Sequence, residues 1–182
     1  MHALGISLRV GDDRLANLLG VTALAAADRL RGAVEADLGH GGAAPAVLVH
    51  LRAHPGESIE ALRRVLAISQ PATVRAVDRL AVEGLVERRP GPDRRTLALF
   101  LTRRGQHAAR RVLARRGASL RDLLAALDED ERARLLPLLE KLTSCLAVDR
   151  AGALNVCRMC DRRACLQRPG CPLGHTTESG SA

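Results

Sequence analysis

Residues 69–105 constrain the fold of this chain more than any other stretch, because they predict a helix, a β-hairpin and the start of another helix in direct succession. Ser69 suits the N-cap of the first helix, and Pro71 lies in its first turn, where a missing N–H is tolerated. Apolar residues then recur at helical spacing. Gly84 suits the left-handed position that ends a helix, with Leu85 packing back on it. The stretch therefore predicts a helix over roughly residues 69–83 with one packed face.

The opposite face of this helix is small, basic and hydrogen-bonding. At about 100° per residue, it carries Gln70, Ala72, Arg75, Ala76 and Arg79. These side chains suit close approach to a negatively charged partner.

A β-hairpin follows the helix. Residues 85–88 predict a short strand, residues 90–93 are rich in turn formers, and residues 96–101 are a β-capable apolar run. The tip and flanks of the hairpin carry four arginines: Arg88, Arg89, Arg94 and Arg95. Exposed charges contribute little to folding, so this clustering indicates a polyanionic ligand.

The order of these motifs resembles that of the MarR family of winged helix-turn-helix regulators. The sequence VDRLAVEGLVER at 77–88 is followed by Asp-Arg-Arg at 93–95 and Leu-Thr-Arg-Arg-Gly at 101–105. The resemblance covers roughly residues 12–148 and is strongest at 58–105. It implies a mainly α, α+β winged helix-turn-helix fold with N- and C-terminal dimerisation helices. It also implies a homodimeric bacterial transcription factor, usually a repressor, rather than an enzyme.

The resemblance and the basic helix face together predict a DNA interface. Helix 69–83 is expected in the major groove, and the resemblance places the hairpin arginine Arg94 in the minor groove. Arg95 is expected on phosphates or in an ion pair with Asp93. The predicted DNA-binding residues are Ser69, Gln70, Ala72, Thr73, Arg75, Arg79, Arg94 and Arg95. Two-fold symmetry predicts a pseudo-palindromic operator with half-sites about one turn, ~10 bp, apart.

Composition agrees with duplex DNA as the partner. The net charge of +8 favours an anionic partner, nucleic acid ahead of a membrane surface. The chain has no Trp, no Tyr and a single Phe, which argues against the aromatic platforms that bind single strands. No apolar run approaches the ~20 residues of a membrane span, and residues 1–10 lack the pattern of a signal peptide. We therefore expect a cytoplasmic protein with no membrane contact.

Helical periodicity predicts the remaining elements. The first expected helix begins at Asp12 or Asp13 and runs to about Leu38. Three more are expected over about Pro45 to Arg52, Ile59 to about Leu66, and Thr102 to about Leu127. A leucine-rich helix should follow from residue 128, with a kink at Pro137. Asp128 and Glu131 fit a capping box at the start of that last helix. The leucines of the first and last of these helices fit a dimer core.

The expected organisation has four parts. They are an N-terminal tail (1–11), a winged-helix domain with dimerisation helices (12–148, DNA-binding core about 43–102), a Cys-rich segment (149–175) and a disordered tail (176–182).

Four cysteines within fifteen residues form the second informative stretch: Cys157, Cys160, Cys165 and Cys171. They follow a break at Ala151-Gly152 and lie in a segment that is too short and polar to build its own core. We therefore expect this segment to fold around a metal centre. Four thiolates close a tetrahedral zinc site and also hold an iron–sulfur cluster. The single Cys-x₂-Cys motif and the closing Cys-Pro are compatible with both zinc and an iron–sulfur cluster, so the spacing does not identify the metal.

Other histidines and cysteines are expected outside this centre. Cys145 is expected in the core, His175 in the tail, and His40, His50 and His54 on the surface or in loops. Free or disulfide-switching thiols remain an alternative to a metal at the four cysteines.

The functional prediction is a regulator that responds to redox state, iron or zinc through the cysteine segment. The alternative is a repressor with a small-molecule effector, in which a structural zinc clip occupies that segment. Two other functional classes fit the sequence less well. One is a thiol–disulfide oxidoreductase that uses Cys157 and Cys160, but the sequence around these cysteines lacks the βαβ pattern of such enzymes. The other is a protein-interaction module, which would show no sequence preference on DNA.

Overall fold

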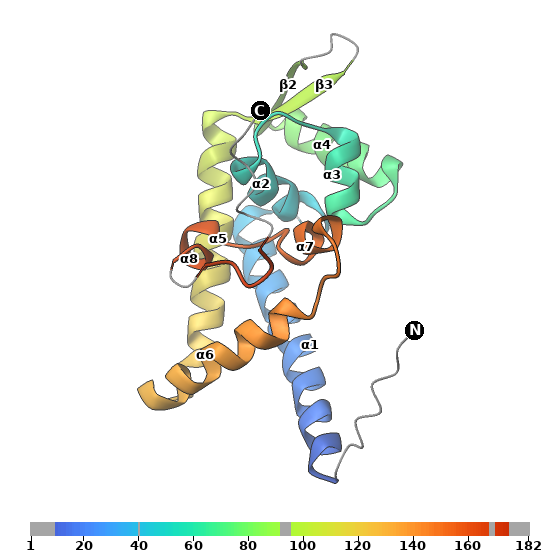
Figure 1. Ribbon diagram of the computed structural model, residues 1–182. Coiled ribbons are helices and arrows are strands. Elements are labelled where there is room, and N and C mark those ends of the chain that lie inside the picture. The colour runs from blue at the N-terminus through green and yellow to red at the C-terminus, as the bar shows by residue number, and fades with distance from the viewer. Residues whose placement is uncertain (1–9, 40, 92–95, 168–169, 175–182) are drawn as a thin grey trace.

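The computed structural model describes residues 10–39, 41–91, 96–167 and 170–174. Its elements are α1 (Val10–Leu38), α2 (Ala44–Ala53), β1 (Glu57–Ser58), α3 (Ile59–Leu66), α4 (Gln70–Val82), β2 (Val86–Pro90), β3 (Leu97–Leu101), α5 (Arg103–Leu124), α6 (Glu129–Ser144), α7 (Arg150–Val156) and α8 (Arg162–Cys165). Figure 1 shows the β2–β3 hairpin at one end of the molecule, with α3 and α4 beside it and α1 and α5 running away from it. The predicted mainly helical α+β winged-helix fold is confirmed.

The core lies between α2, α3, α4 and a three-stranded antiparallel sheet of order β1-β3-β2. Its largest fully buried apolar side chains are Leu48, Leu51, Leu62, Leu80 and Leu99. Complete burial of a leucine side chain contributes about 1.5–3 kcal/mol. Because α3 and α4 share this core with the sheet, the packing fixes the angle between the two helices and the hairpin.

The turn after α4 has the predicted form. Gly84 has φ of 67°, the Gly84 amide donates to Ala81 O at 2.9 Å, and the Leu85 amide donates to Leu80 O at 2.8 Å. This pair of bonds is a Schellman motif. Leu85 belongs to that motif, so β2 begins at Val86, one residue later than predicted.

Some boundaries differ from the prediction. Helix α1 begins at Val10, which places Asp12 and Asp13 inside its first turn rather than at its cap. The two-residue strand β1 was not predicted, and α5 ends at Leu124 rather than near Leu127. Helix α6 continues through Pro137. The predicted capping box at its start is confirmed, since Asp128 and Glu131 each accept a hydrogen bond from the other's backbone amide.

The predicted break at Ala151-Gly152 is wrong. Asp149 caps a helix there, accepting from the Gly152 amide at 2.7 Å, and α7 runs through both residues. Helix α7 packs against α3 (Figure 1), so the Cys-rich segment lies on the winged helix.

Helices α1 and α5 pack side by side. Arg111 and Arg115 of α5 donate to the Asp37 carboxylate at 3.0 and 2.9 Å, and these two hydrogen bonds lower the pKa of Asp37. Toward its N-terminus, α1 presents exposed apolar side chains: Leu15, Leu18, Leu19, Val21 and Leu24. Helix α6 has no buried residue within the described chain, and its exposed leucines are Leu136, Leu138, Leu139 and Leu142. No helix in the described ranges is long and apolar enough to cross a membrane.

Candidate nucleic-acid interface and cysteine cluster

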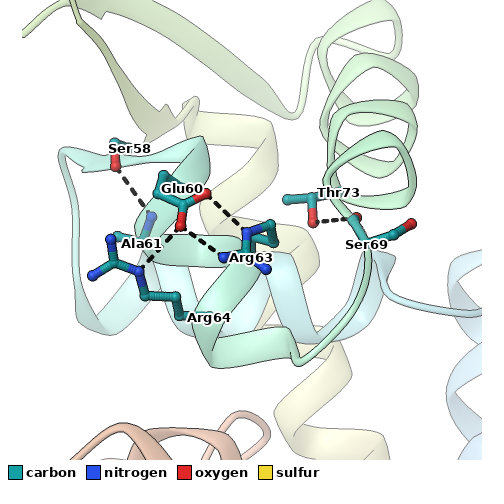
Figure 2. A network of polar contacts seen from close by, with 7 residues as sticks. All are labelled: Ser58, Glu60, Ala61, Arg63, Arg64, Ser69 and Thr73. Atoms are coloured by element: carbon teal, nitrogen blue, oxygen red, sulfur yellow. Dashed lines mark hydrogen bonds and ion pairs between the residues drawn. The ribbon is translucent and has the colours of Figure 1, made fainter.

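Helices α3 and α4 form the helix-turn-helix, and a serine caps each of them. The Ala61 amide donates to Ser58 Oγ at 3.1 Å, and the Ala72 amide donates to Ser69 Oγ at 3.4 Å (Figure 2). Between the helices, Ala67 has a φ of 53°, the left-handed conformation that reverses the chain in few residues.

Glu60 organises the basic side chains on α3. Its carboxylate accepts from Arg63 at 2.8 Å and from Arg64 at 3.2 Å, as Figure 2 shows. These hydrogen bonds lower the pKa of Glu60 to about 2. The two guanidiniums are therefore held along α3, next to the turn that leads into α4.

The exposed face of α4 carries most of the predicted contact residues. Ser69, Gln70, Arg75 and Arg79 are exposed, and Ala72 is half-buried. Arg75 and Arg79 are four residues apart and so share one side of the helix. Val77 and Leu80 are fully buried on the opposite side.

Thr73 is a correction to the predicted set. Its side chain is fully buried, and its hydroxyl donates to Ser69 O at 3.1 Å (Figure 2). Thr73 therefore faces the core and stabilises the first turn of α4, where it has no access to an external ligand.

The hairpin is tied to α4 by an ion pair between Arg88 and Asp78. The neighbouring Arg89 pairs with Glu87, and its guanidinium lies 4.7 Å from the centre of the Phe100 ring. The hairpin is thus held in a fixed position relative to the exposed face of α4. The predicted wing-tip residues Arg94 and Arg95 lie outside the described residues.

The predicted metal ligands converge. Cys157 and Cys160 flank the turn after α7, Cys165 ends α8, and Cys171 begins the next turn. All four are half-buried and line one cavity of about 20 Å³ together with residues of α2. No disulfide joins the described cysteines.

The thiols influence one another strongly. A hydrogen bond from Cys160 lowers the pKa of the Cys157 thiol, and the same contact raises the pKa of Cys160. Burial and the charge of Cys160 raise the pKa of Cys165 to about 12. The raised pKa values of Cys160 and Cys165 mean that several thiolates cannot coexist here without a compensating positive charge. No group of three or more donor side chains among the described residues is already arranged to hold a metal ion.

Two of the histidines expected at the surface line this cavity instead. His50 is 4% exposed and stacks on His54 with 4.6 Å between ring centres. Its Nε2 lies 3.3 Å from the Glu57 carboxylate but makes no well-aligned hydrogen bond within the described residues. Nε2 of His54 lies 3.0 Å from a guanidinium nitrogen of Arg162. His40 lies outside the described residues.

Cys145 differs from the other four cysteines. It is exposed at the end of α6, so the expectation of a core residue is wrong. Its thiol donates to Lys141 O at 3.4 Å, the usual contact of a polar side chain at a helix end. His175 lies outside the described residues.

Comparison with known proteins agrees with this geometry. The model of the MarR family matches residues 39–96, a stretch that includes α2, α3, α4 and β2. No curated protein sequence matches the chain significantly. Among solved structures, wild-type MarR from Escherichia coli is 27% identical with a TM-score of 0.63, over 74% of this chain and 96% of that chain.

Two mycobacterial structures give similar values. Rv1404 of Mycobacterium tuberculosis is 26% identical with a TM-score of 0.65, over 76% of this chain and 95% of that chain. The MarR family protein Rv2887 of the same species is 27% identical with a TM-score of 0.60, over 72% of this chain and 95% of that one.

The fold is that of a MarR-family regulator. MarR family proteins are transcription regulators and not enzymes. Because the MarR structure is covered almost completely while about a quarter of this chain is not, this chain carries additional structure beyond the MarR fold. The four clustered cysteines lie outside residues 39–96.

Sequence reasoning missed the residues that join this addition to the MarR core. Asn155 of α7 donates from its side chain to Val65 O of α3 at 2.7 Å, and Arg162 of α8 contacts His54 of α2. The spacing of His50 and His54 on one helix face was available in the sequence. Nothing in the sequence indicated that the C-terminal segment folds onto that face.

Proposed function

We propose that this chain is a homodimeric regulator of transcription, a repressor, that binds duplex DNA at a specific pseudo-palindromic sequence. The observation that carries the proposal is the exposed, basic face of α4 beside a fixed hairpin. A helix of this kind fits the major groove, where arginine and glutamine side chains hydrogen-bond to base edges.

Two details of the site support the major groove as the position of α4. Arg75 and Arg79 extend from the side of α4 that faces away from the core, and Gln70 lies at its N-terminus, the end that carries a positive partial charge. The small side chain of Ala72 on this face allows close approach of the helix backbone to DNA. The Arg88–Asp78 pair sets the hairpin at one end of this face, in position for an adjacent groove.

Dimerisation would bury the apolar faces of α1 and α6. Leu15 is 66% exposed and Leu136 is 58% exposed, and neighbouring apolar residues on both helices are also exposed. Groups of exposed apolar side chains mark association sites when they form a shared surface. A second copy of the chain would cover both helices and place two α4 helices for the two half-sites.

The signal would enter through the cysteine cluster, so that redox state, iron or zinc changes operator affinity. A small-molecule effector is the second candidate. It would occupy an open pocket of about 620 Å³ between α1, α4 and α5, lined in part by Leu38, Glu83, Arg104 and His107. A ligand there would separate α4 from the long helices and change the distance between the two DNA-reading helices.

The test is selection of operator sequences from a random duplex library, followed by titration of the best site at physiological salt. Arg75→Ala and Arg79→Ala should each weaken that affinity by about 1–3 kcal/mol. Arg121→Ala, a matched arginine at the far end of α5, should leave it unchanged. Equal binding to selected and scrambled duplexes would contradict sequence-specific recognition, and unchanged affinity in both α4 variants would remove α4 from the interface.

A further inference from the structure

Among its described residues, the segment formed by α7, α8 and the turn to residue 174 buries few apolar side chains, although Met159 is partly buried against the core. Ala153 is the buried residue of α7, and α8 has none within the described chain. Short segments without a core are usually held by disulfides or metals. The described cysteines form no disulfide, so four half-buried thiols on one small cavity call for another explanation.

The backbone presents these thiols in tight turns. The Cys160 amide donates to Cys157 O at 2.8 Å, and the Gly174 amide donates to Cys171 O at 3.0 Å. The Cys165 amide donates to Asp161 O at 3.0 Å at the end of α8. The four cysteines thus lie in three local hydrogen-bonded turns, and their side chains line the same cavity.

We propose that Cys157, Cys160, Cys165 and Cys171 bind one metal ion of the zinc class as four thiolates, and that this ion holds the C-terminal segment on α2 and α3. The donor set fits such an ion, because four thiolates form a closed tetrahedral site. The ion supplies the positive charge that four neighbouring thiolates require.

The size of the cavity favours a single ion over a cluster. With Zn–S bonds of about 2.3 Å, a tetrahedral site places its sulfur atoms about 3.8 Å apart, in contact with one another. The four thiols line one cavity of about 20 Å³, which has room for one particle the size of a water molecule. A cluster would instead hold the sulfurs apart around a core of iron and sulfide.

The histidines beside the cysteines form the outer wall of the site. His50 is engaged with Glu57, and His54 with Arg162. Arg162 begins α8, three residues before Cys165, so this contact connects the cysteine turns to α2. The ligand set is therefore the four thiolates, with the histidines positioning the segment.

The site has a direct path to the helix-turn-helix. Asn155 lies two residues before Cys157 and donates to Val65 O, in the last turn of α3, which leads into α4. Release of the ion should loosen α7 and with it the end of α3. The effect of this loosening on operator affinity rests on the proposed function, whereas metal binding itself does not.

The first experiment measures metal and acid-labile sulfide in the full-length protein purified without added metal. We expect one zinc per chain and no sulfide. Serine substitution at each of the four clustered cysteines should abolish stoichiometric zinc, while Cys145→Ser, the matched control, should retain it. Full zinc in all four single variants, or iron with an equal amount of sulfide, would overturn the single-ion site.

Thiol titration provides a second readout that does not depend on how the variants fold. In the metal-loaded wild-type protein one thiol, that of Cys145, should react at once with Ellman's reagent, and four more should react after a chelator is added. Immediate reaction of all five would overturn the site.

Hydrogen exchange tests the connection to α3. Chelation should speed amide exchange in α7 and at the end of α3 but not in the middle of α5, and Asn155→Ala should reproduce the change in α3 with the metal retained. Unchanged exchange in α3 would overturn the connection. Metal loss with operator binding intact would count against the connection alone, and a stable metal site in a protein that binds no operator would count against the proposed function alone.

Discussion

Gly105 offers the sharpest test of how the wing is held on the winged helix. It lies in the first turn of α5, where an added Cβ would stand 1.9 Å from the carbonyl oxygen of Leu85 and 2.9 Å from its carbon. Both are backbone atoms, so no side-chain rotation relieves the overlap. Since a carbon normally approaches a carbonyl oxygen to about 3.3 Å, Gly105→Ala would force the start of α5 back by roughly 1.4 Å.

This movement would stretch two hydrogen bonds that join α5 to the turn after α4. The Thr102 hydroxyl donates to Gly84 O at 2.6 Å, and the Thr102 amide donates to Leu85 O at 3.1 Å. Losing both costs about 1–3 kcal/mol, and the strain of overpacking adds about 1–3 kcal/mol. Alanine recovers at most about 1 kcal/mol as a better helix former. We therefore expect a net loss of about 1–5 kcal/mol, or a fall in Tm of roughly 2–20 °C.

The control is the same substitution where space is open. Gly32 lies exposed in α1 with no atom within 4 Å of an added Cβ among the described residues, so Gly32→Ala should stabilise by about 0.5–1 kcal/mol. Urea unfolding followed by circular dichroism compares the two variants. If Gly105→Ala were as stabilising as Gly32→Ala, the close approach of α5 to Leu85 would not be a feature of the folded protein.

Three further predictions concern pH, capping and assembly. Burial raises the pKa of Glu57, but the contact with His50 lowers it, and the net pKa lies below the ordinary value of 4.5. The charged carboxylate therefore stabilises the fold above pH 4.5, and this stability is lost as the pH falls through the folded pKa. Unfolding titrations of Glu57→Gln should accordingly show a weaker loss of stability in acid than those of the wild type. Asp128→Ala removes the cap of α6 and should cost about 1 kcal/mol by chemical denaturation, whereas an unchanged midpoint would mean that α6 contributes nothing to the cooperative unit. Leu142→Glu on the exposed face of α6 should shift the protein toward monomer in sedimentation experiments, while Leu97→Glu on the hairpin should not, and a dimer that survives the first change would exclude that face of α6 from the interface.

The predicted helix-turn-helix agrees with the structure because its signals are local. Ser58 and Ser69 cap their helices, and the Gly84 turn has the left-handed conformation that its sequence requires. Each of these features depends on a few neighbouring residues, so a single sequence carries the information. The same reasoning placed the exposed face of α4 correctly, except at Thr73, whose hydroxyl bonds to the backbone and lets the side chain enter the core.

Two of the errors fall where segments meet through tertiary packing. β1 exists because Glu57 and Ser58 pair with Leu99 and Ala98, some forty residues away, and two residues alone have no strand signal. His50 was assigned to the surface because its partner Glu57 and the cysteine turns reach it only through tertiary packing.

The sequence by itself determined the helix caps, the turn glycines, the basic face of α4 and the grouping of four cysteines, since these follow from residue type and short spacing. Only the tertiary structure decided that the cysteine segment lies on α2 and α3, that two histidines complete its wall, and that Asn155 links it to Val65 O. The physical reason is that burial and long-range hydrogen bonds depend on which surfaces meet, and many different partners would satisfy the same local pattern.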